Sequence, residues 1–178
     1  MLFFISLLPT QAVTAQTFKV ADKSVAVDYF KQVASKTVEV IDPNESQPGK
    51  PVKIKFHGFH GLKFVDRVFG NRGAWSKSKE IVFECADGYK PTLPTVEFPA
   101  GNYYFATSRE GSKEFSLVNN LKDGKKVALG PYYIVWTDKN YQTKEEAHYW
   151  PYQVVAISVH SSIAPNKSDG TLGFFVFE

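Results

Sequence analysis

The stretch Ile81–Pro94, IVFECADGYKPTLP, carries the clearest fold signal in the chain. In its first five residues Ile81, Phe83 and Cys85 alternate with Val82 and Glu84, a pattern that predicts a strand with one buried face. The Asp87-Gly88 pair then predicts a tight turn, and prolines stiffen the chain that follows. We therefore expect a polar loop held between a core strand and a rigid exit, where small domains commonly place a binding site.

Alternating apolar patterns occur on both sides of this stretch and predict a β-rich domain. The Asp123-Gly124 pair predicts a hairpin turn. Tyr152–Val159 is apolar on both faces, so we expect this strand at the centre of a sheet. The other predicted strands are Thr17–Val20, Thr37–Ile41, Pro51–Phe56, Tyr103–Thr107, Glu114–Val118, Lys126–Leu129, Tyr132–Trp136 and Phe174–Phe177.

Two segments have helical spacing. Ser24–Ala34 predicts a short amphipathic helix with Ser24 as its N-cap. Leu62–Phe69 predicts a second helix, which follows the segment His57-Gly-Phe-His-Gly61 at the end of a strand.

The composition fits one globular domain. The chain has 178 residues, of which 43% are hydrophobic and 15% aromatic, enough for a sizeable core. A formal net charge of +3, carried by lysines that stand singly, is too small and too evenly spread to indicate a nucleic-acid partner.

The first fifteen residues predict an export signal. The apolar run Leu2–Leu8 is followed by Pro9 and by small residues ending in Val13-Thr14-Ala15, which suit a cleavage site. The run is too short to span a bilayer, so we expect no membrane span in the mature chain. We expect residues 16–178 to form a single domain that is periplasmic or otherwise exported.

The single cysteine, Cys85, excludes an intramolecular disulfide. Because it shares the inward phase of Ile81 and Phe83, we expect its thiol to be buried.

Several motifs, taken in order, resemble the molybdopterin-binding domain of the sulfite oxidase family. They are the helix that begins at Gly61-Leu62, the Asp-Gly-Tyr…Leu-Pro loop ending at Pro94, the segment Leu129–Val135 and the segment Trp150–Ile157. The resemblance covers roughly residues 37–159. It implies an α+β fold with a mixed, β-barrel-like sheet core and a few short helices.

The same resemblance makes molybdopterin a candidate cofactor and a c-type cytochrome a candidate periplasmic redox partner. Catalytic members of the family ligate molybdenum with a cysteine that precedes the Gly-Leu helix, whereas this chain has no cysteine before Gly61. Cys85 lies in a later strand, so its assignment as a cofactor-binding residue would require an unorthodox position.

Three groups of residues are candidates for chemistry. His57 and His60, with His148 from another loop, could bind copper or zinc, or could be ordinary loop histidines. Asp87, Gly88, Tyr89 and Lys90 could bind a ligand or partner, or could form only a structural turn. Near turns, aromatic side chains, chiefly Tyr132 and Trp150, could form a shelf for a ligand or part of the core.

The leading hypothesis is an exported, non-catalytic binding or accessory domain of sulfite oxidase-like fold within a redox system, with no cofactor expected. The alternatives are a molybdopterin-dependent oxidoreductase that uses Cys85 and a metal-binding protein that uses His57 and His60.

Overall fold

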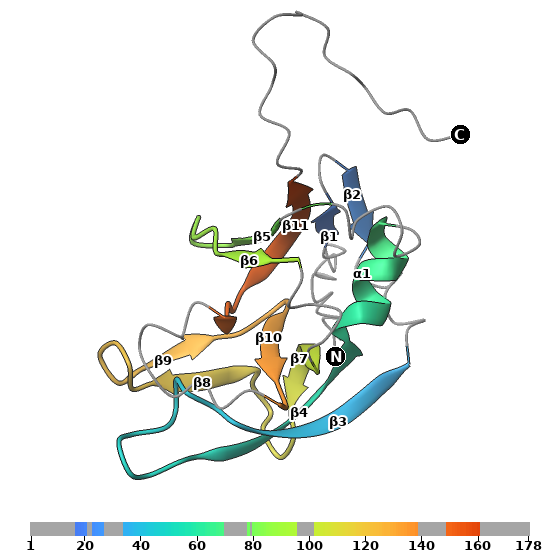
Figure 1. Cartoon of the computed structure of the whole chain (residues 1–178). Helices are drawn as coiled ribbons and strands as arrows, with labels where there is room; N and C mark the ends of the chain where they lie inside the picture. Colours follow the sequence, from blue (N-terminus) through green and yellow to red (C-terminus); the bar gives the residue numbers. More distant parts are fainter. Residues whose placement is uncertain are drawn as a thin grey trace, which may run out of the picture.

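The computed structural model describes residues 17–20, 23–26, 34–69, 78, 80–95, 102–138 and 149–160. Within them the chain is mostly β-strand, with one short helix (Figure 1). The predicted export signal, the predicted strand Phe174–Phe177 and His148 lie outside the described residues.

One sheet has five strands in the order β2-β1-β11-β5-β6. Its middle strand, β11, pairs parallel with β1 and antiparallel with β5. This confirms the central position expected from its apolar faces. The strands are β1 (Thr17–Val20), β2 (Lys23–Ala26), β5 (Glu80–Cys85), β6 (Thr92–Pro94) and β11 (Val154–His160).

A second sheet has four antiparallel strands in the order β10-β7-β4-β3, and β8 and β9 form a separate hairpin around the predicted Asp123-Gly124 turn. Where β4 meets β7 the register shifts between His57 and Gly58, a bulge that increases local twist. The strands are β3 (Ser35–Ile41), β4 (Lys53–His60), β7 (Tyr103–Arg109), β8 (Ser116–Asn119), β9 (Lys125–Ala128) and β10 (Tyr133–Trp136).

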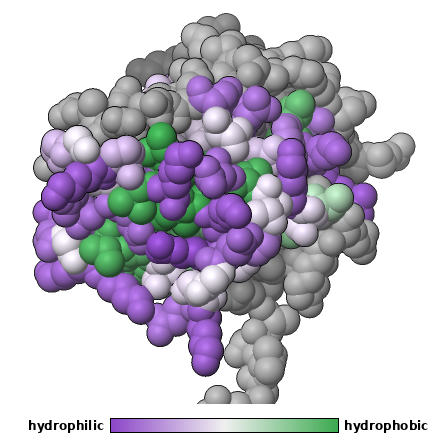
Figure 2. Space-filling model, turned by 90° about the horizontal axis from the view of Figure 1, so that it is seen from below, coloured by the Kyte–Doolittle hydropathy of each residue, from purple (hydrophilic) through white to green (hydrophobic). Residues whose placement is uncertain are grey.

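The β3–β4 pair shows the burial expected from its sequence pattern. Val38 and Val40 on β3 and Ile54 and Phe56 on β4 are buried, whereas the residues that alternate with them are mainly exposed. Seen from below the view of Figure 1, the molecule shows hydrophobic patches set among many hydrophilic side chains (Figure 2).

The helix α1 (Gly61–Phe69) covers part of the second sheet. Phe64 on its inner side stacks on Phe105 of β7, with ring centroids 4.0 Å apart. Gly61, the first residue of the helix, lies directly against the ring of Tyr103. A Cβ at this position would lie 1.8 Å from that ring. Glycine is therefore the residue that allows β4 to turn directly into α1.

Two expectations require correction. The strands of the described segments form three separate sheets with no closed barrel, so the β-rich, α+β character is confirmed only at the coarser level. The helix expected over Ser24–Ala34 is wrong at its start, because Lys23–Ala26 pairs with β1. Pairing with a neighbouring strand overrides the weak helical propensity of this segment. Residues 27–33 lie outside the described part.

The described residues include no helix that is both long and apolar enough to cross a membrane.

Candidate functional site

The Asp87–Lys90 loop is the turn of the β5–β6 hairpin, and its own hydrogen bonds fix its shape. Cys85 N–H donates to the carbonyl of Tyr89 (2.8 Å), and Gly88 N–H donates to the carbonyl of Cys85 (2.9 Å). The Asp87 carboxylate accepts from Tyr89 N–H at 3.0 Å, and Gly88 has φ +85°, which glycine adopts without strain. The loop is therefore ordered before any partner arrives.

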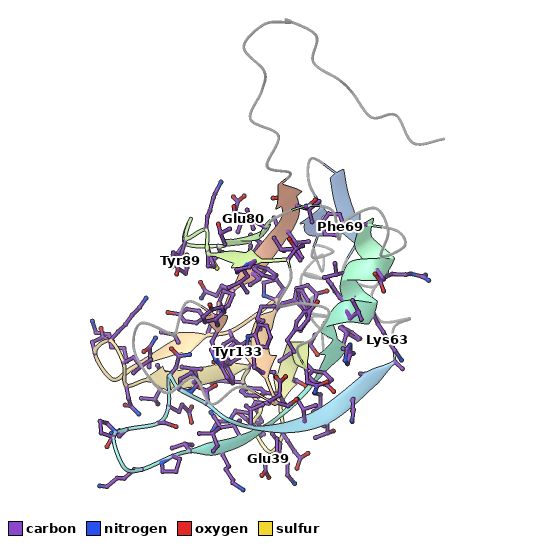
Figure 3. All side chains as sticks on the ribbon, viewed as in Figure 1. Glu39, Lys63, Phe69, Glu80, Tyr89 and Tyr133 are labelled. Carbon is purple, nitrogen blue, oxygen red and sulfur yellow. The ribbon has the colours of Figure 1, made fainter. Side chains whose placement is uncertain are left out.

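Tyr89 projects from this loop with half of its surface exposed. Figure 3 shows it at the tip of the β5–β6 hairpin. Burial of its remaining surface raises the pKa of the phenol, with a further rise from Cys85 and a counteracting effect from the nearby Lys122 ammonium. The phenol is therefore protonated at neutral pH and can donate a hydrogen bond.

Lys122, in the β8–β9 hairpin, brings a positive charge to the same region. Its ammonium lies 3.4 Å from the hydroxyl of Tyr152 and 5.8 Å from the centroid of that ring. Among the described residues no carboxylate lies within ion-pair distance of Lys122, whereas Lys125 and Lys126 of the same hairpin are paired with Asp123 and Glu114. We call Asp87, Tyr89, Lys122 and Tyr152 the tyrosine–lysine rim.

The loop and Tyr152 are connected through Gln153. The carbonyl of Gln153 accepts from Ala86 N–H (2.9 Å), and Gln153 N–H donates to the carbonyl of Leu129 (2.9 Å). Gln153 has φ +57°, an uncommon conformation for a residue other than glycine. These two bonds hold the unusual backbone next to Tyr152 and link the loop to Leu129, which directly follows β9.

Lys90 and Gly88 have structural roles in this arrangement. Lys90 forms an ion pair with Glu84 across the hairpin (3.4 Å), and Gly88 supplies the positive φ of the turn. Of the four predicted loop residues, Asp87 and Tyr89 are therefore the ones that contribute to the rim.

Cys85 is buried, as its inward phase predicts, with 4% of its surface exposed. Desolvation, and then the negative charges of Asp87 and Glu84, raise the pKa of its thiol to about 12. A cysteine binds a metal ion as the thiolate. A buried thiol with a raised pKa therefore does not fit the alternative in which Cys85 would bind molybdenum.

Tyr132 and Trp150 belong to the core. Both are fully or almost fully buried, and each contacts another aromatic ring: Tyr132 packs on Phe105 and Trp150 on Tyr133. Tyr152, by contrast, belongs to the rim, where its hydroxyl lies 3.4 Å from the Lys122 ammonium.

The two histidines of the predicted metal site make separate contacts on β4. His57 is hydrogen-bonded through Nδ1 to the Thr37 hydroxyl (2.7 Å), whereas His60 packs edge-on against Tyr104. Burial, with Lys63 and Lys36 nearby, lowers the pKa of His60. Residues three apart on a continuous strand point to opposite faces, and the described residues contain no group of three or more metal-binding side chains.

Lys122 is the rim residue that the sequence did not indicate. Its position just before the Asp123-Gly124 pair identifies a hairpin, but no local pattern shows that this hairpin lies beside the β5–β6 turn.

No family model matches the chain, and no curated protein matches its sequence.

Proposed function

We propose that this chain is an exported, non-catalytic binding domain of sulfite oxidase-like fold that works within a redox system. It recognises a partner protein through the tyrosine–lysine rim. A c-type cytochrome is the partner class that the family resemblance favours.

The observation that carries the proposal is the position of Tyr89 on an ordered loop near Lys122, which has no carboxylate partner among the described residues. An amphipathic ring held in place costs little entropy when it is buried by a partner. The ammonium and the phenol hydroxyls are hydrogen-bond donors, so the rim suits carboxylate groups on the partner.

The state of Cys85 favours a binding domain over a molybdopterin enzyme. The only thiol in the chain lies in the core with a raised pKa, so it is poorly suited to act as the thiolate that anchors molybdenum in the family.

To identify the partner, the wild type and the rim variants are immobilised and exposed to a periplasmic extract from the native host. A recovered protein is identified by mass spectrometry, purified and titrated against each variant. We expect Lys122→Glu and Tyr89→Ala to lower its affinity by about tenfold or more. Lys55→Glu is the matched control, since Lys55 lies on β4 and carries the same charge change.

Equal affinity for the wild type, Tyr89→Phe, Tyr89→Ala, Asp87→Asn and Lys122→Glu, all folded, would reject the rim as the binding site. Elemental analysis tests the non-catalytic part separately. About one molybdenum per chain, lost on Cys85→Ser, would establish the oxidoreductase instead.

A further inference from the structure

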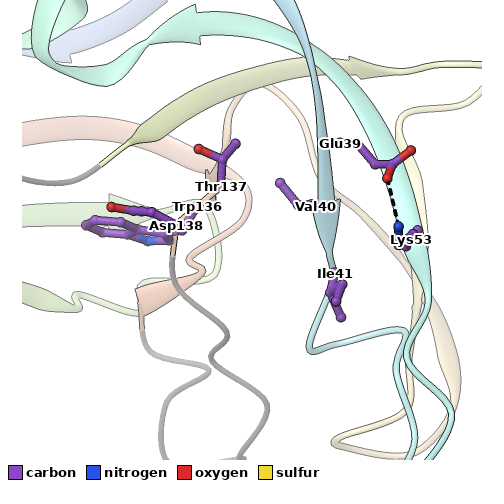
Figure 4. A pocket seen from close by; sticks show the side chains of 7 residues that line it. All are labelled: Glu39, Val40, Ile41, Lys53, Trp136, Thr137 and Asp138. Atoms are coloured by element: carbon purple, nitrogen blue, oxygen red, sulfur yellow. Dashed lines mark ion pairs between the residues drawn. The ribbon is translucent and has the colours of Figure 1, made fainter.

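A cleft lies between the outer side of β3 and the end of β10, away from the tyrosine–lysine rim. It has a volume of about 360 Å³ and is lined by Glu39, Val40 and Ile41 of β3, Lys53 of β4, and Trp136, Thr137 and Asp138. Figure 4 shows β3 on one side and Trp136–Asp138 on the other, with Val40 pointing into the space between them. The side chains of successive residues in a strand point to opposite faces of the sheet. Because the cleft contacts the three consecutive residues Glu39, Val40 and Ile41, it lies along the edge of β3.

The backbone of β3 is available along this edge. The N–H of Asp42 donates to Val52 across the β3–β4 pair (3.0 Å), and hydrogen-bonded pairs alternate along an antiparallel ladder. Val40 and Val38 therefore bond to β4, whereas Thr37, Glu39 and Ile41 turn their N–H and C=O groups outward. Within the described segments nothing bonds to these outward groups, and β3 has seven residues, a long edge to leave open.

The side chains around the cleft favour a positively charged occupant. The Asp138 carboxylate is oriented by the N–H of Asn102 (3.2 Å), and none of the described cations lies within 4.0 Å of it. Glu39 is paired with Lys53 at 3.2 Å. Asp138 is therefore the uncompensated negative charge among the residues that line the cleft. Val40, Ile41 and the buried Trp136 add apolar surface between the charges.

We propose that this cleft binds an extended peptide segment of a partner protein, in which apolar residues alternate with Lys or Arg, by strand addition to the outer edge of β3. The main chain of the segment bonds to the outward groups of Thr37, Glu39 and Ile41, and one of its basic residues pairs with Asp138. Thr137 and Asp138 close the far side of the cleft.

The probe is a capped peptide of alternating Val and Lys, titrated into the full chain labelled with ¹⁵N. We expect binding with a dissociation constant between about 10 μM and 1 mM, with the largest amide shifts at Thr37, Glu39 and Ile41. A peptide of alternating Val and Glu, with the same β propensity, is expected to bind at least about tenfold more weakly.

Variants separate the backbone contribution from the side-chain contribution. Glu39→Pro and Glu39→Ala both lose the carboxylate that pairs with Lys53, but only Glu39→Pro also loses an outward N–H, while the β3–β4 ladder stays intact. We therefore expect Glu39→Pro to bind about tenfold more weakly than Glu39→Ala. Asp138→Asn is expected to weaken binding and its salt dependence. Lys122→Glu is expected to leave it unchanged, which separates this site from the tyrosine–lysine rim.

The proposal is overturned if the Val-Lys peptide does not bind at about 1 mM, if its amide shifts fall on β2 or β6, or if Glu39→Pro binds as well as Glu39→Ala. Should Glu39→Pro fail to fold, the location of the amide shifts in the wild type still decides the outcome.

Discussion

The phenol of Tyr133 donates a 2.7 Å hydrogen bond to Oδ2 of Asp42, a residue 91 positions earlier in the chain. Asp42 directly follows β3 and Tyr133 begins β10, and these strands are the two outer strands of the same four-stranded sheet. Asn44 completes the network by donating from Nδ2 to the Tyr133 hydroxyl (2.9 Å). Side chains thus join the two outer strands at one end, although their backbones do not pair.

The Asp42 carboxylate should make stability depend on pH. Asp42 is fully buried, and desolvation raises its pKa from 3.8 to about 6, against the opposing effect of the hydrogen bonds from Tyr133, Glu45 and Asn44. The native state therefore binds this proton more tightly than the unfolded state. The contribution of this group to stability increases as pH falls through 6 and levels off below 3.8.

We expect the wild type to gain about 1 kcal/mol relative to Asp42→Asn between pH 7 and pH 5. Urea denaturation of both proteins at each pH measures this difference, and the comparison cancels exposed carboxylates such as Glu114 and Asp123, whose pKa values are lowered. Parallel pH dependence in the two proteins would show that Asp42 does not titrate in this range.

Removing the Tyr133 hydroxyl should destabilise the fold. Tyr133→Phe leaves the buried Asp42 carboxylate without its side-chain donor and Asn44 Nδ2 without its acceptor, so we expect a loss of about 3 kcal/mol. Tyr152→Phe is the matched control, since the Tyr152 hydroxyl makes only long contacts, 3.5 Å to Asn119 and 3.4 Å to Lys122. A loss of similar size in both variants would contradict the role assigned to the network.

The difference between local and distant relationships explains how much of this structure the sequence predicted. The strand Ile81–Cys85, the buried face of Val38 and Val40, and the position of β11 all follow from periodicity within a few residues. The burial of Cys85 follows from the same periodicity, because its phase matches that of Phe83.

Relationships between distant segments left no such pattern. Glu45 forms a bidentate ion pair with Arg109, 64 positions away, and Lys122 lies over the ring of Tyr152, but neither residue differs in its local sequence from an ordinary surface charge. Trp150 was a candidate for the surface because Trp near a turn suits an interface as well as a core. Only packing against Tyr133 decides between the two.

Gly58 should tolerate no side chain. A Cβ at this position would lie 2.4 Å from the carbonyl oxygen of Phe105 and 2.7 Å from the Cα of Ala106, both on the neighbouring strand β7. Because backbone atoms cannot move aside cheaply, we expect Gly58→Ala to destabilise by about 3 kcal/mol or more.

Gly49→Ala is the control for this prediction. Gly49 has φ +72°, and no described atom lies within 4 Å of the point that a Cβ would occupy, so the substitution should cost only about 1 kcal/mol of backbone strain. Denaturation midpoints measure both variants. A Gly58→Ala variant no less stable than Gly49→Ala would mean that β4 and β7 separate more easily than their packing indicates.

The Cys85 thiol should be almost unreactive in the native protein. Its pKa of about 12, against 9.0 for an ordinary cysteine, reduces the thiolate fraction at pH 8 by about a thousandfold, and burial restricts access further. We expect a disulfide reagent to modify the native thiol at least about a thousandfold more slowly than the urea-unfolded thiol. Tyr89→Ala is an informative second protein, because it removes a large side chain from the loop that follows Cys85 and keeps the backbone hydrogen bonds of that loop, Asp87 and Glu84. Modestly faster thiol modification in this variant would fit protection of Cys85 by the hairpin. Modification of the native wild type at nearly the unfolded rate would show that the thiolate is accessible, and would restore Cys85 as a candidate ligand.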